Sequence, residues 1–180
     1  MLEGELIENR VIVYGKEGLD LYDENGYGKP TEDRLELALV EAAFLLKKEK
    51  LKFFGTENGK KKIWKFDDFY KYSVEREAEF HQKFVVFSDL RERGYLVKTG
   101  FKFGAHFRVY ERGVKLKRGP KAAHEHTKFV VHAISEEDRF SYPELSRATR
   151  LAQNIRAKMV WAVVDSENDV TYYTITRFTP

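Results

Sequence analysis

The apolar pattern of the chain changes at Gly94, and this change limits the folds that the chain can adopt. Between Phe66 and Arg93 apolar residues recur at helical spacing, which predicts a long helix that is interrupted near Glu79. Gly94 can cap this helix, because glycine readily adopts the left-handed conformation that follows many helices. Shorter, alternating segments follow Gly94 and predict strands. The chain is therefore expected to have two halves bridged by a long helix.

The second half is expected to combine about five strands with helices. The predicted strands cover residues 95–99, 106–112, 127–134, 159–165 and 170–178. A helix is expected at 141–158, because Ser141 and Glu144 have the spacing of a capping box. An apolar stripe on this helix can face a core. It consists of Leu145, Ala148, Ala152 and Ile155.

The first half combines strand and helix patterns. Two short strands are expected within residues 10–28, with a connection at 15–18 and a turn at 25–26. A helix is expected over 32–50, since apolar residues recur there at three- and four-residue spacing. Together the patterns predict an α+β fold in two domains. Residues 1–78 form a small N-terminal α+β domain, and in the C-terminal domain, 79–180, helices flank a mixed sheet of about five strands.

The composition excludes several functional classes. With 42% hydrophobic and 34% charged residues the chain is typical of a soluble globular protein, and no apolar run approaches the roughly 18 residues that a membrane span needs. The absence of cysteine excludes cysteine catalysis, disulfides and cysteine-based zinc sites. The first residues show neither a basic leader nor an apolar signal segment, so a cytoplasmic protein without a membrane partner is expected.

Basic residues are concentrated in two segments, although the net charge is only +3. These segments are 98–121 and 147–158, and the first also contains the aromatic residues Phe101, Phe103, Phe107 and Tyr110. Such a segment can be an ordinary solvated face. It is also typical of a surface that follows nucleic-acid phosphates, so both interpretations remain open.

Three of the five histidines lie in AAHEHTKFVVHAI, residues 122–134. On an extended strand at roughly 3.3 Å per residue, His126 and His132 would be about 20 Å apart and could not share a metal ion. His124 and His126 alone give fewer ligands than a zinc site requires, so no metal site is expected. His132 is interpreted as a polar residue at a strand end. His126, where a basic segment enters an apolar strand, is placed to donate a proton to a leaving oxygen.

Residues 87–113 read FSDLRERGYLVKTGFKFGAHFRVYERG, and this run resembles the catalytic half of the archaeal tRNA-splicing endonucleases. In that family a helix ends in D-L-R-x-R-G and is followed by V-K-T-G-x-K-F/Y-G-x-x-F-R-x-Y. The resemblance continues through HTKFVV, RLAQNIRAKMVWAV and YYTITRF, and extends more loosely to LELALVEAAFLL. It therefore covers nearly the whole chain.

The resemblance implies an enzyme that uses neither a metal nor a cofactor, with its nuclease domain in the C-terminal half. Such enzymes cut precursor tRNA within a bulge-helix-bulge element and leave 2′,3′-cyclic phosphate and 5′-hydroxyl ends. The ribose 2′-hydroxyl attacks the scissile phosphate. One group must remove its proton, another must protonate the leaving oxygen, and a cation must offset the developing charge. The family's tyrosine, the base, corresponds to Tyr110, and its histidine, the acid, corresponds to His126.

The family's lysine has no direct counterpart in this sequence. In NIRAKMVW its position is Ala157, and Lys158 follows one residue later. On an ideal helix the next residue points about 100° away, so Lys158 is not a simple replacement. Three explanations remain open: the helix ends and Lys158 reaches the site, a variant carries alanine in place of lysine, or the chain is a natural subunit of impaired activity. The third makes a noncatalytic, RNA-positioning subunit the alternative function.

The resemblance also assigns residues to RNA binding and assembly. Arg150 and Arg177 correspond to the pair that holds a flipped-out bulge base between guanidinium planes. Further phosphate contacts are expected from Lys115, Lys117, Arg118 and Lys121. The acidic turn DSEND, with Asp165, Glu167 and Asp169, is similar to a loop that enters a basic groove of an opposing subunit. Homo-oligomers and tetramers with a second type of subunit both remain open.

Overall fold

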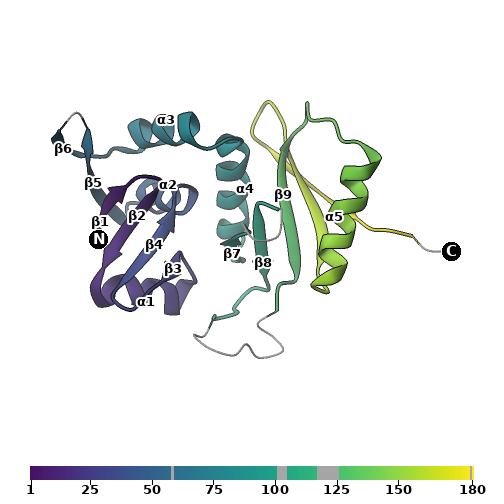
Figure 1. Ribbon diagram of the computed structural model, residues 1–180, viewed down its shortest axis with the longest axis horizontal. Coiled ribbons are helices and arrows are strands. Elements are labelled where there is room, and N and C mark those ends of the chain that lie inside the picture. Colours follow the sequence, from purple (N-terminus) through teal and green to yellow (C-terminus); the bar gives the residue numbers. More distant parts are fainter. Residues whose placement is uncertain (58, 101–104, 117–125, 179) are drawn as a thin grey trace. The chain divides into compact units, whose positions relative to one another are not determined.

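The computed structural model describes residues 1–57, 59–100, 105–116, 126–178 and 180. The chain divides into two compact units, Met1–Phe84 and Val85–Pro180, and each unit contains its own sheet (Figure 1). The α+β composition expected for both halves is confirmed. The domain boundary between residues 78 and 79 stays a prediction.

The first unit contains a six-stranded sheet in the order β3-β4-β2-β1-β5-β6. Strands β1 and β5 are parallel, and the other neighbours are antiparallel. The strands are β1 (Leu2–Ile7), β2 (Arg10–Tyr14), β3 (Lys29–Pro30), β4 (Arg34–Ala38), β5 (Leu51–Glu57) and β6 (Lys60–Ile63). The helices are α1 (Gly15–Asn25), α2 (Leu39–Lys47) and α3 (Phe66–Arg76), and α4 (Phe80–Glu92) begins in this unit.

Residues 15–25 form α1, so the second strand predicted within 10–28 is wrong. Gly26 adopts a left-handed φ of 71°, and its N–H donates to the carbonyl of Tyr22, as is typical of a helix end. Gly18 lets the helix approach β2 closely, because a β-carbon there would lie 2.6 Å from the Val13 carbonyl oxygen. The segment therefore forms a helix that packs against the sheet.

The helix predicted over 32–50 begins too early. Residues 34–38 form β4, in which Leu35 and Leu37 are both fully buried. Helix α2 begins after Ala38, whose N–H donates to the carboxylate of Glu41 at 2.9 Å. The same buried carboxylate accepts the N–H of Gly28 at 2.8 Å. A tertiary contact thus sets the start of this helix, and the apolar spacing alone did not indicate it.

The interruption expected near Glu79 is confirmed. Helix α3 ends at Arg76, and Glu79 has a φ of 59° before α4 begins. Gly94 follows α4 with a φ of 86°. The N–H of Tyr95 donates to the carbonyl of Leu90 at 3.0 Å, which completes the cap.

The second unit contains a five-stranded mixed sheet in the order β11-β10-β9-β8-β7, as predicted. The β9–β10 pair is parallel and the other pairs are antiparallel. The strands are β7 (Leu96–Thr99), β8 (Phe107–Tyr110), β9 (Phe129–Ser135), β10 (Lys158–Val164) and β11 (Val170–Ile175). The last helix, α5 (Tyr142–Asn154), connects β9 to β10.

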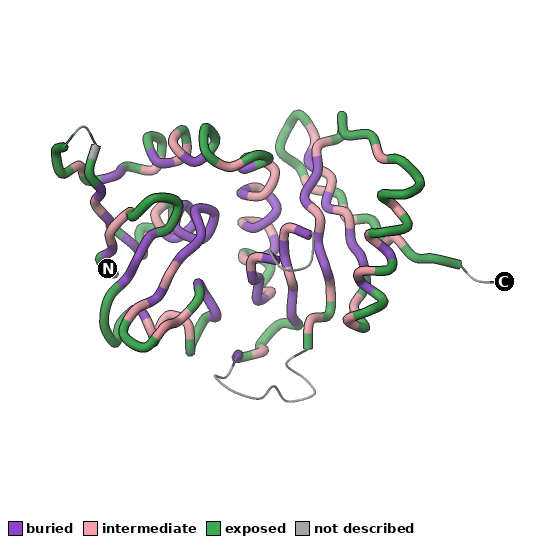
Figure 2. The backbone as a smooth tube through the Cα atoms, viewed as in Figure 1, coloured by how far each residue is buried: buried purple, intermediate pink, exposed green. Residues whose placement is uncertain are grey.

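Helices α4 and α5 cover opposite faces of this second sheet. On the α4 face, the rings of Phe87 and Phe107 lie 5.7 Å apart, and Val109 and Val160 line a cavity with Leu90. On the α5 face, a buried cluster includes Val130, Ala152 and Met159. Figure 2 shows buried residues within β8, β9 and β10 and exposed residues on the outer side of α5.

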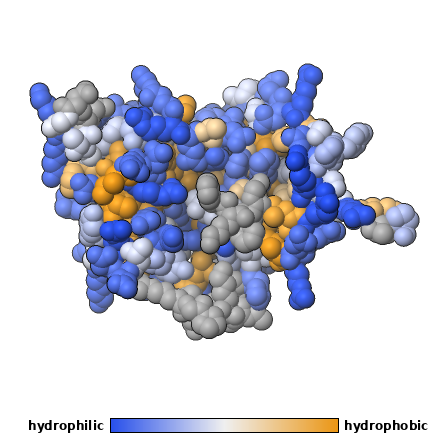
Figure 3. Space-filling view, in the orientation of Figure 1, coloured by the Kyte–Doolittle hydropathy of each residue, from blue (hydrophilic) through white to orange (hydrophobic). Residues whose placement is uncertain are grey.

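Hydrophilic residues predominate on the face of the molecule in Figure 3, with apolar areas between them. In the described parts of the chain, every helix is too short or too polar to cross a bilayer.

Candidate active site

Three predicted catalytic residues lie on chain segments that meet at one end of the second sheet. β8 ends at Tyr110, His126 lies shortly before β9, and Lys158 begins β10. Because β9 and β10 are parallel, both strands start at the same end of the sheet. Strand β8 finishes at that end, because it is antiparallel to β9. The Lys128 N–H donates to the Val109 carbonyl at 2.9 Å, and the Lys158 N–H donates to the Lys128 carbonyl at 3.0 Å. Backbone hydrogen bonds thus join the three segments.

The three side chains differ in their exposure. Tyr110 is fully buried, whereas His126 and Lys158 are exposed. Tyr110 lies on the α5 face, because Phe107 and Val109 of the same strand contact the α4 face and side chains alternate along a strand. The side chain of Tyr110 is therefore enclosed by the fold, whereas the side chain of His126 is available to a ligand from solvent.

Ala157 and Lys158 project to opposite faces of the sheet. Helix α5 ends at Asn154 instead of continuing to 158, and Arg156 adopts a left-handed φ of 55°. Ala157 packs against the cluster on the α5 face, which is also the face of Tyr110. Strand alternation directs Lys158 to the other face, with Val160. The helix end that the first explanation for Lys158 requires is present, but the strand turns this side chain away from Ala157.

The sequence did not single out two cations beside Tyr110. The β7–β8 register pairs Leu96 with Tyr110 and Lys98 with Arg108, so Lys98 and Arg108 share the face of the tyrosine. Lys98 is only 9% exposed, and Arg108 is half-buried. Both belong to the basic segment 98–121 noted in the sequence. The two-residue spacing of Arg108 and Tyr110 is visible in the sequence. The position of Lys98 beside them depends on the register of β7 and β8.

The two arginines assigned to base binding lie toward the same end of the sheet. Arg150 is exposed in the C-terminal half of α5, the helix that precedes β10. Arg177 is exposed just beyond β11, whose final residue, Ile175, lies opposite Met159 at the start of β10. Lys115 is exposed after β8. The predicted contact residues Lys117, Arg118 and Lys121, and also His124, lie outside the described residues.

The acidic turn connects β10 to β11, at the end of the sheet away from Tyr110. One oxygen of Asp165 accepts the N–H groups of Glu167 and Asp169, both at 2.9 Å. The N–H of Ser166 donates to Glu136 at 2.8 Å. Glu167 and Asp169 remain exposed, so the turn is held by hydrogen bonds while it presents carboxylates to solvent.

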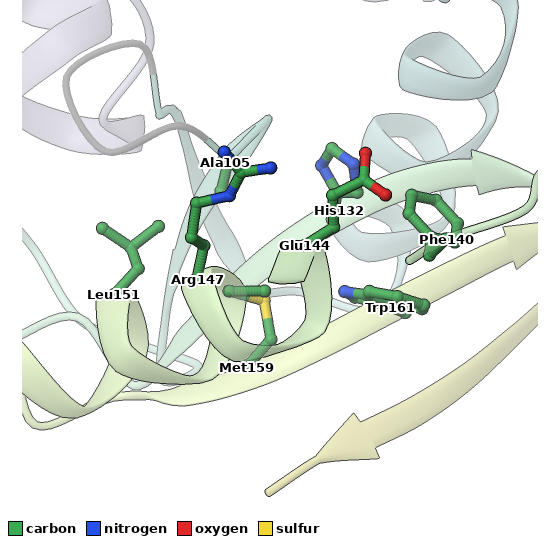
Figure 4. A pocket seen from close by; sticks show the side chains of 9 residues that line it. Ala105, His132, Phe140, Glu144, Arg147, Leu151, Met159 and Trp161 are labelled. Carbon is green, nitrogen blue, oxygen red and sulfur yellow. The ribbon is translucent and has the colours of Figure 1, made fainter. Parts of the chain in front are cut away.

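A cavity of about 370 Å³ lies between α5 and the sheet (Figure 4). His132 stacks on His106, with ring centroids 4.4 Å apart. The ring centroids of Phe140 and Trp161 are 4.3 Å apart. His132 lies at the middle of β9, so its interpretation as a strand-end residue is wrong. In the described ranges, no group of three or more His, Asp or Glu residues is arranged to hold a metal ion.

Hydrogen bonds shift the acidity of groups around α5 and on the α4 face. The N–H and hydroxyl of Ser141 both donate to Glu144 at 2.7 Å, and they hold the pKa of this carboxyl below its ordinary value. The predicted capping box is therefore confirmed. On the α4 face, burial raises the pKa of Tyr172, and its hydrogen bond to Asp89 adds to this effect. Arg93 donates to the same carboxylate at 2.7 Å, so these groups form a structural network.

Both halves of the chain match models of one protein family. Residues 2–70 match the tRNA intron endonuclease, N-terminal domain, and residues 80–172 match the tRNA intron endonuclease, catalytic C-terminal domain. The two-domain fold and these two matches thus define a tRNA intron endonuclease architecture. The chain belongs to the tRNA intron endonuclease family, which confirms the resemblance found in residues 87–113.

Curated archaeal relatives support this membership. The tRNA-splicing endonuclease of Methanothermobacter thermautotrophicus is 39% identical over 164 residues, covering 89% of this chain and 87% of that protein. The tRNA-splicing endonuclease of Thermococcus onnurineus is 37% identical over 155 residues, covering 86% and 83%. The match to the tRNA-splicing endonuclease of Methanococcoides burtonii, 38% over 177 residues, covers 97% of this chain but 48% of that protein.

Proposed function

We propose that this chain is a catalytic subunit that excises introns from precursor tRNA. It cuts at bulge-helix-bulge splice sites and leaves 2′,3′-cyclic phosphate and 5′-hydroxyl ends, without a metal ion. The main support is the pair Tyr110 and His126, which lie on segments joined at one end of the nuclease sheet. Family membership supports tRNA intron cleavage as the reaction.

In the proposed reaction Tyr110 removes the proton of the ribose 2′-hydroxyl, and His126 protonates the leaving 5′ oxygen. A neutral phenol is a poor base, so Tyr110 requires nearby positive charge that favours the phenolate. Tyr110 is fully buried in the free protein, and its hydroxyl must therefore become accessible when RNA binds. His126 is already exposed at the mouth of β9.

The third group, a cation, offsets negative charge on the phosphate as the bond to the leaving oxygen breaks. Lys158 remains a candidate for this role if its long side chain bends round the start of β10. Ala157 favours the alternative function, in which the chain positions RNA while a partner subunit cuts. In either case the exposed carboxylates of the 165–169 turn are proposed to hold an opposing subunit, identical or different, and Lys115 is proposed to contact phosphate.

Incubation with an intron-containing precursor tRNA tests the proposed function. We expect two cuts that release the intron and both tRNA halves from the chain alone or from its complex with a second subunit. A chain that binds this RNA but leaves it uncut, in both settings, supports the RNA-positioning alternative and contradicts a catalytic role.

Replacing both Arg150 and Arg177 by alanine should weaken binding of bulged RNA. Stacking on a base contributes about 1–3 kcal/mol, so the loss of affinity should be roughly 5- to 150-fold. A fully paired duplex of the same length should lose much less, because it offers no flipped-out base. Titration of both RNAs measures the difference, with Arg139→Ala as a matched control because Arg139 is also an exposed arginine of this unit. Equal losses of affinity for the two RNAs would show that Arg150 and Arg177 contact phosphates in general and do not hold a flipped-out base.

A further inference from the structure

We propose that the cavity between α5 and the second sheet binds one unpaired base of the RNA substrate. This inference rests on the proposed function and adds to it a recognition site away from the proposed catalytic end of the sheet. Arg150 and Arg177, which are already assigned to base binding, are not among the described residues that line the cavity. The cavity therefore holds a different nucleotide from the one between these arginines.

The helix wall of the cavity has space for a ligand because α5 presents a small residue there. The residues of α5 that line the cavity recur at three- and four-residue spacing, so they lie on one face of the helix. They are Glu144, Arg147, Ala148 and Leu151. Ala148 contributes only a methyl group on this face, opposite Met159 of β10. The resulting volume of about 370 Å³ lies within the range of about 300–1,000 Å³ that is typical of small-ligand pockets.

Aromatic rings form one end of the cavity (Figure 4). His132 lies opposite Trp161 in the β9–β10 register, and the ring of Phe140 lies beside that of Trp161. All three side chains are half-buried, so a ligand from solvent can reach them. Unpaired RNA bases stack on the rings of Phe, Trp and His, and every base has a face that can do so. The composition of this end therefore favours a flat aromatic ligand.

The polar groups at the rim of the cavity favour a base over a phosphate. Glu144 and Arg147 are both exposed there and carry opposite charges. The hydrogen bonds from Ser141 reach one oxygen of the Glu144 carboxylate, and the other oxygen accepts none from the described residues. A carboxylate accepts hydrogen bonds from the amino groups of bases, and an arginine donates to their ring nitrogens and carbonyl oxygens. A phosphate would be repelled by the carboxylate, whereas an uncharged base can use both groups.

Trp161 gives a second reason to expect a polar, flat ligand. Trp161 and Met159 lie two residues apart on the cavity face of β10, and the indole nitrogen lies on the side of the ring toward Met159 (Figure 4). This enclosed N–H has no hydrogen-bond partner in the described part of the chain. An enclosed donor without a partner is unfavourable. A base in the cavity supplies acceptor atoms close to this donor.

The cavity also lies on the face of the sheet that carries Tyr110. His106, on which His132 stacks, precedes Tyr110 by four residues, or about 13 Å at roughly 3.3 Å per residue. The His106 N–H donates to the Val131 carbonyl at 3.1 Å, so the β8–β9 pairing continues to this residue. Strand alternation then places His106 and Tyr110 on the same face. A base held in the cavity would thus fix the position of a nearby RNA strand relative to Tyr110.

RNA binding by a variant with a filled cavity tests the proposal. Ala148→Phe places a ring in the cavity. Ser146→Phe is the matched control, because it places the same ring on the exposed side of α5, about 200° around the helix. The ligands are a bulge-helix-bulge RNA and a series in which one unpaired nucleotide at a time lacks its base.

We expect Ala148→Phe to bind the intact RNA about 5- to 150-fold more weakly than the wild type, the usual effect of losing one stacked base. Removal of one particular base should weaken binding by the wild type to a similar extent and cause no further loss in Ala148→Phe. Removal of the base assigned to Arg150 and Arg177 should weaken both proteins equally. Ser146→Phe should behave as the wild type throughout.

Three results would overturn the proposal. The first is wild-type affinity of Ala148→Phe for the intact RNA, and the second is an equal effect of Ala148→Phe on the intact RNA and on every abasic RNA. The third is a change of subunit composition in a native mass spectrum of Ala148→Phe, which would assign the cavity to a side chain of another subunit.

Phe140→Leu keeps the test open if thermal melting shows that Ala148→Phe is unfolded. This variant removes one half-buried ring and keeps an apolar side chain, so its smaller loss of affinity should vanish with the same abasic RNA. A wild type that neither binds nor cuts the RNA contradicts the proposed function, and this inference fails with it. A wild type that cuts the RNA, together with a filled variant that binds it normally, contradicts this inference alone.

Discussion

Replacing His126 by glutamine should slow single-turnover cleavage by about 10²–10⁴-fold, the usual contribution of a general acid. Glutamine keeps the polarity and approximate size of the side chain but cannot protonate the leaving 5′ oxygen. His126 is exposed and precedes β9, so the change should leave thermal stability and RNA affinity nearly unaltered. Rates measured at saturating enzyme, with binding measured separately, isolate the chemical step.

His81→Gln is the matched control for this experiment. His81 is an exposed histidine of the first unit whose Nδ1 lies 2.6 Å from the Tyr70 hydroxyl. The control should cleave at the wild-type rate. A His126→Gln variant that also retains the wild-type rate would remove His126 from the reaction and leave the proton donor unassigned.

Replacing Tyr110 by phenylalanine should reduce the cleavage rate by a similar factor, about 10²–10⁴-fold, because the variant lacks the proposed base. Phenylalanine keeps the buried ring, whereas alanine would leave a cavity that costs about 3–5 kcal/mol and would confuse chemistry with folding. Tyr110 is fully buried, so this distinction matters for the design. Cleavage rate and melting temperature are measured on the same preparations.

Tyr27→Phe provides a control for the loss of a hydroxyl from a buried tyrosine, since Tyr27 is only 8% exposed and lies in the first unit. This variant should cleave normally. Full activity in Tyr110→Phe would contradict its role as the base. A slow variant that also melts at a much lower temperature would show that the hydroxyl holds the fold instead.

Local signals predicted most of the second unit. The Ser141–Glu144 capping box, the Gly94 cap and the alternating segments each report a structure that neighbouring residues determine. The wrong predictions about the fold lie in the first unit, where tertiary contacts determine which segments become helix or strand. Gly18 allows α1 to pack closely on β2, and the buried Glu41 carboxylate joins the start of α2 to Gly28. Neither contact can be recognised from the spacing of apolar residues in the sequence.

The same distinction applies to the candidate site. A family pattern identified Tyr110 and His126, because their residue types and spacing are visible in the sequence. The direction of each side chain depends on where helices end and on strand register. Sequence spacing treated positions 157 and 158 as helical neighbours, whereas the chain there is already extended and its side chains alternate. Register also groups Lys98 and Arg108 with Tyr110, which spacing alone could not do.

Cleavage of a precursor tRNA in the presence of EDTA distinguishes attack by the ribose 2′-hydroxyl from cleavage that depends on a metal ion. Two substrates are compared, one all-ribose and one with a single 2′-deoxynucleotide immediately before the scissile phosphate. We expect the chain, alone or with its second subunit, to cut the ribose substrate in EDTA, to give 2′,3′-cyclic phosphate and 5′-hydroxyl ends, and not to cut the deoxy site. Cleavage that requires Mg²⁺, or that proceeds equally at the deoxy site, would contradict attack by the 2′-hydroxyl and the roles given to Tyr110 and His126.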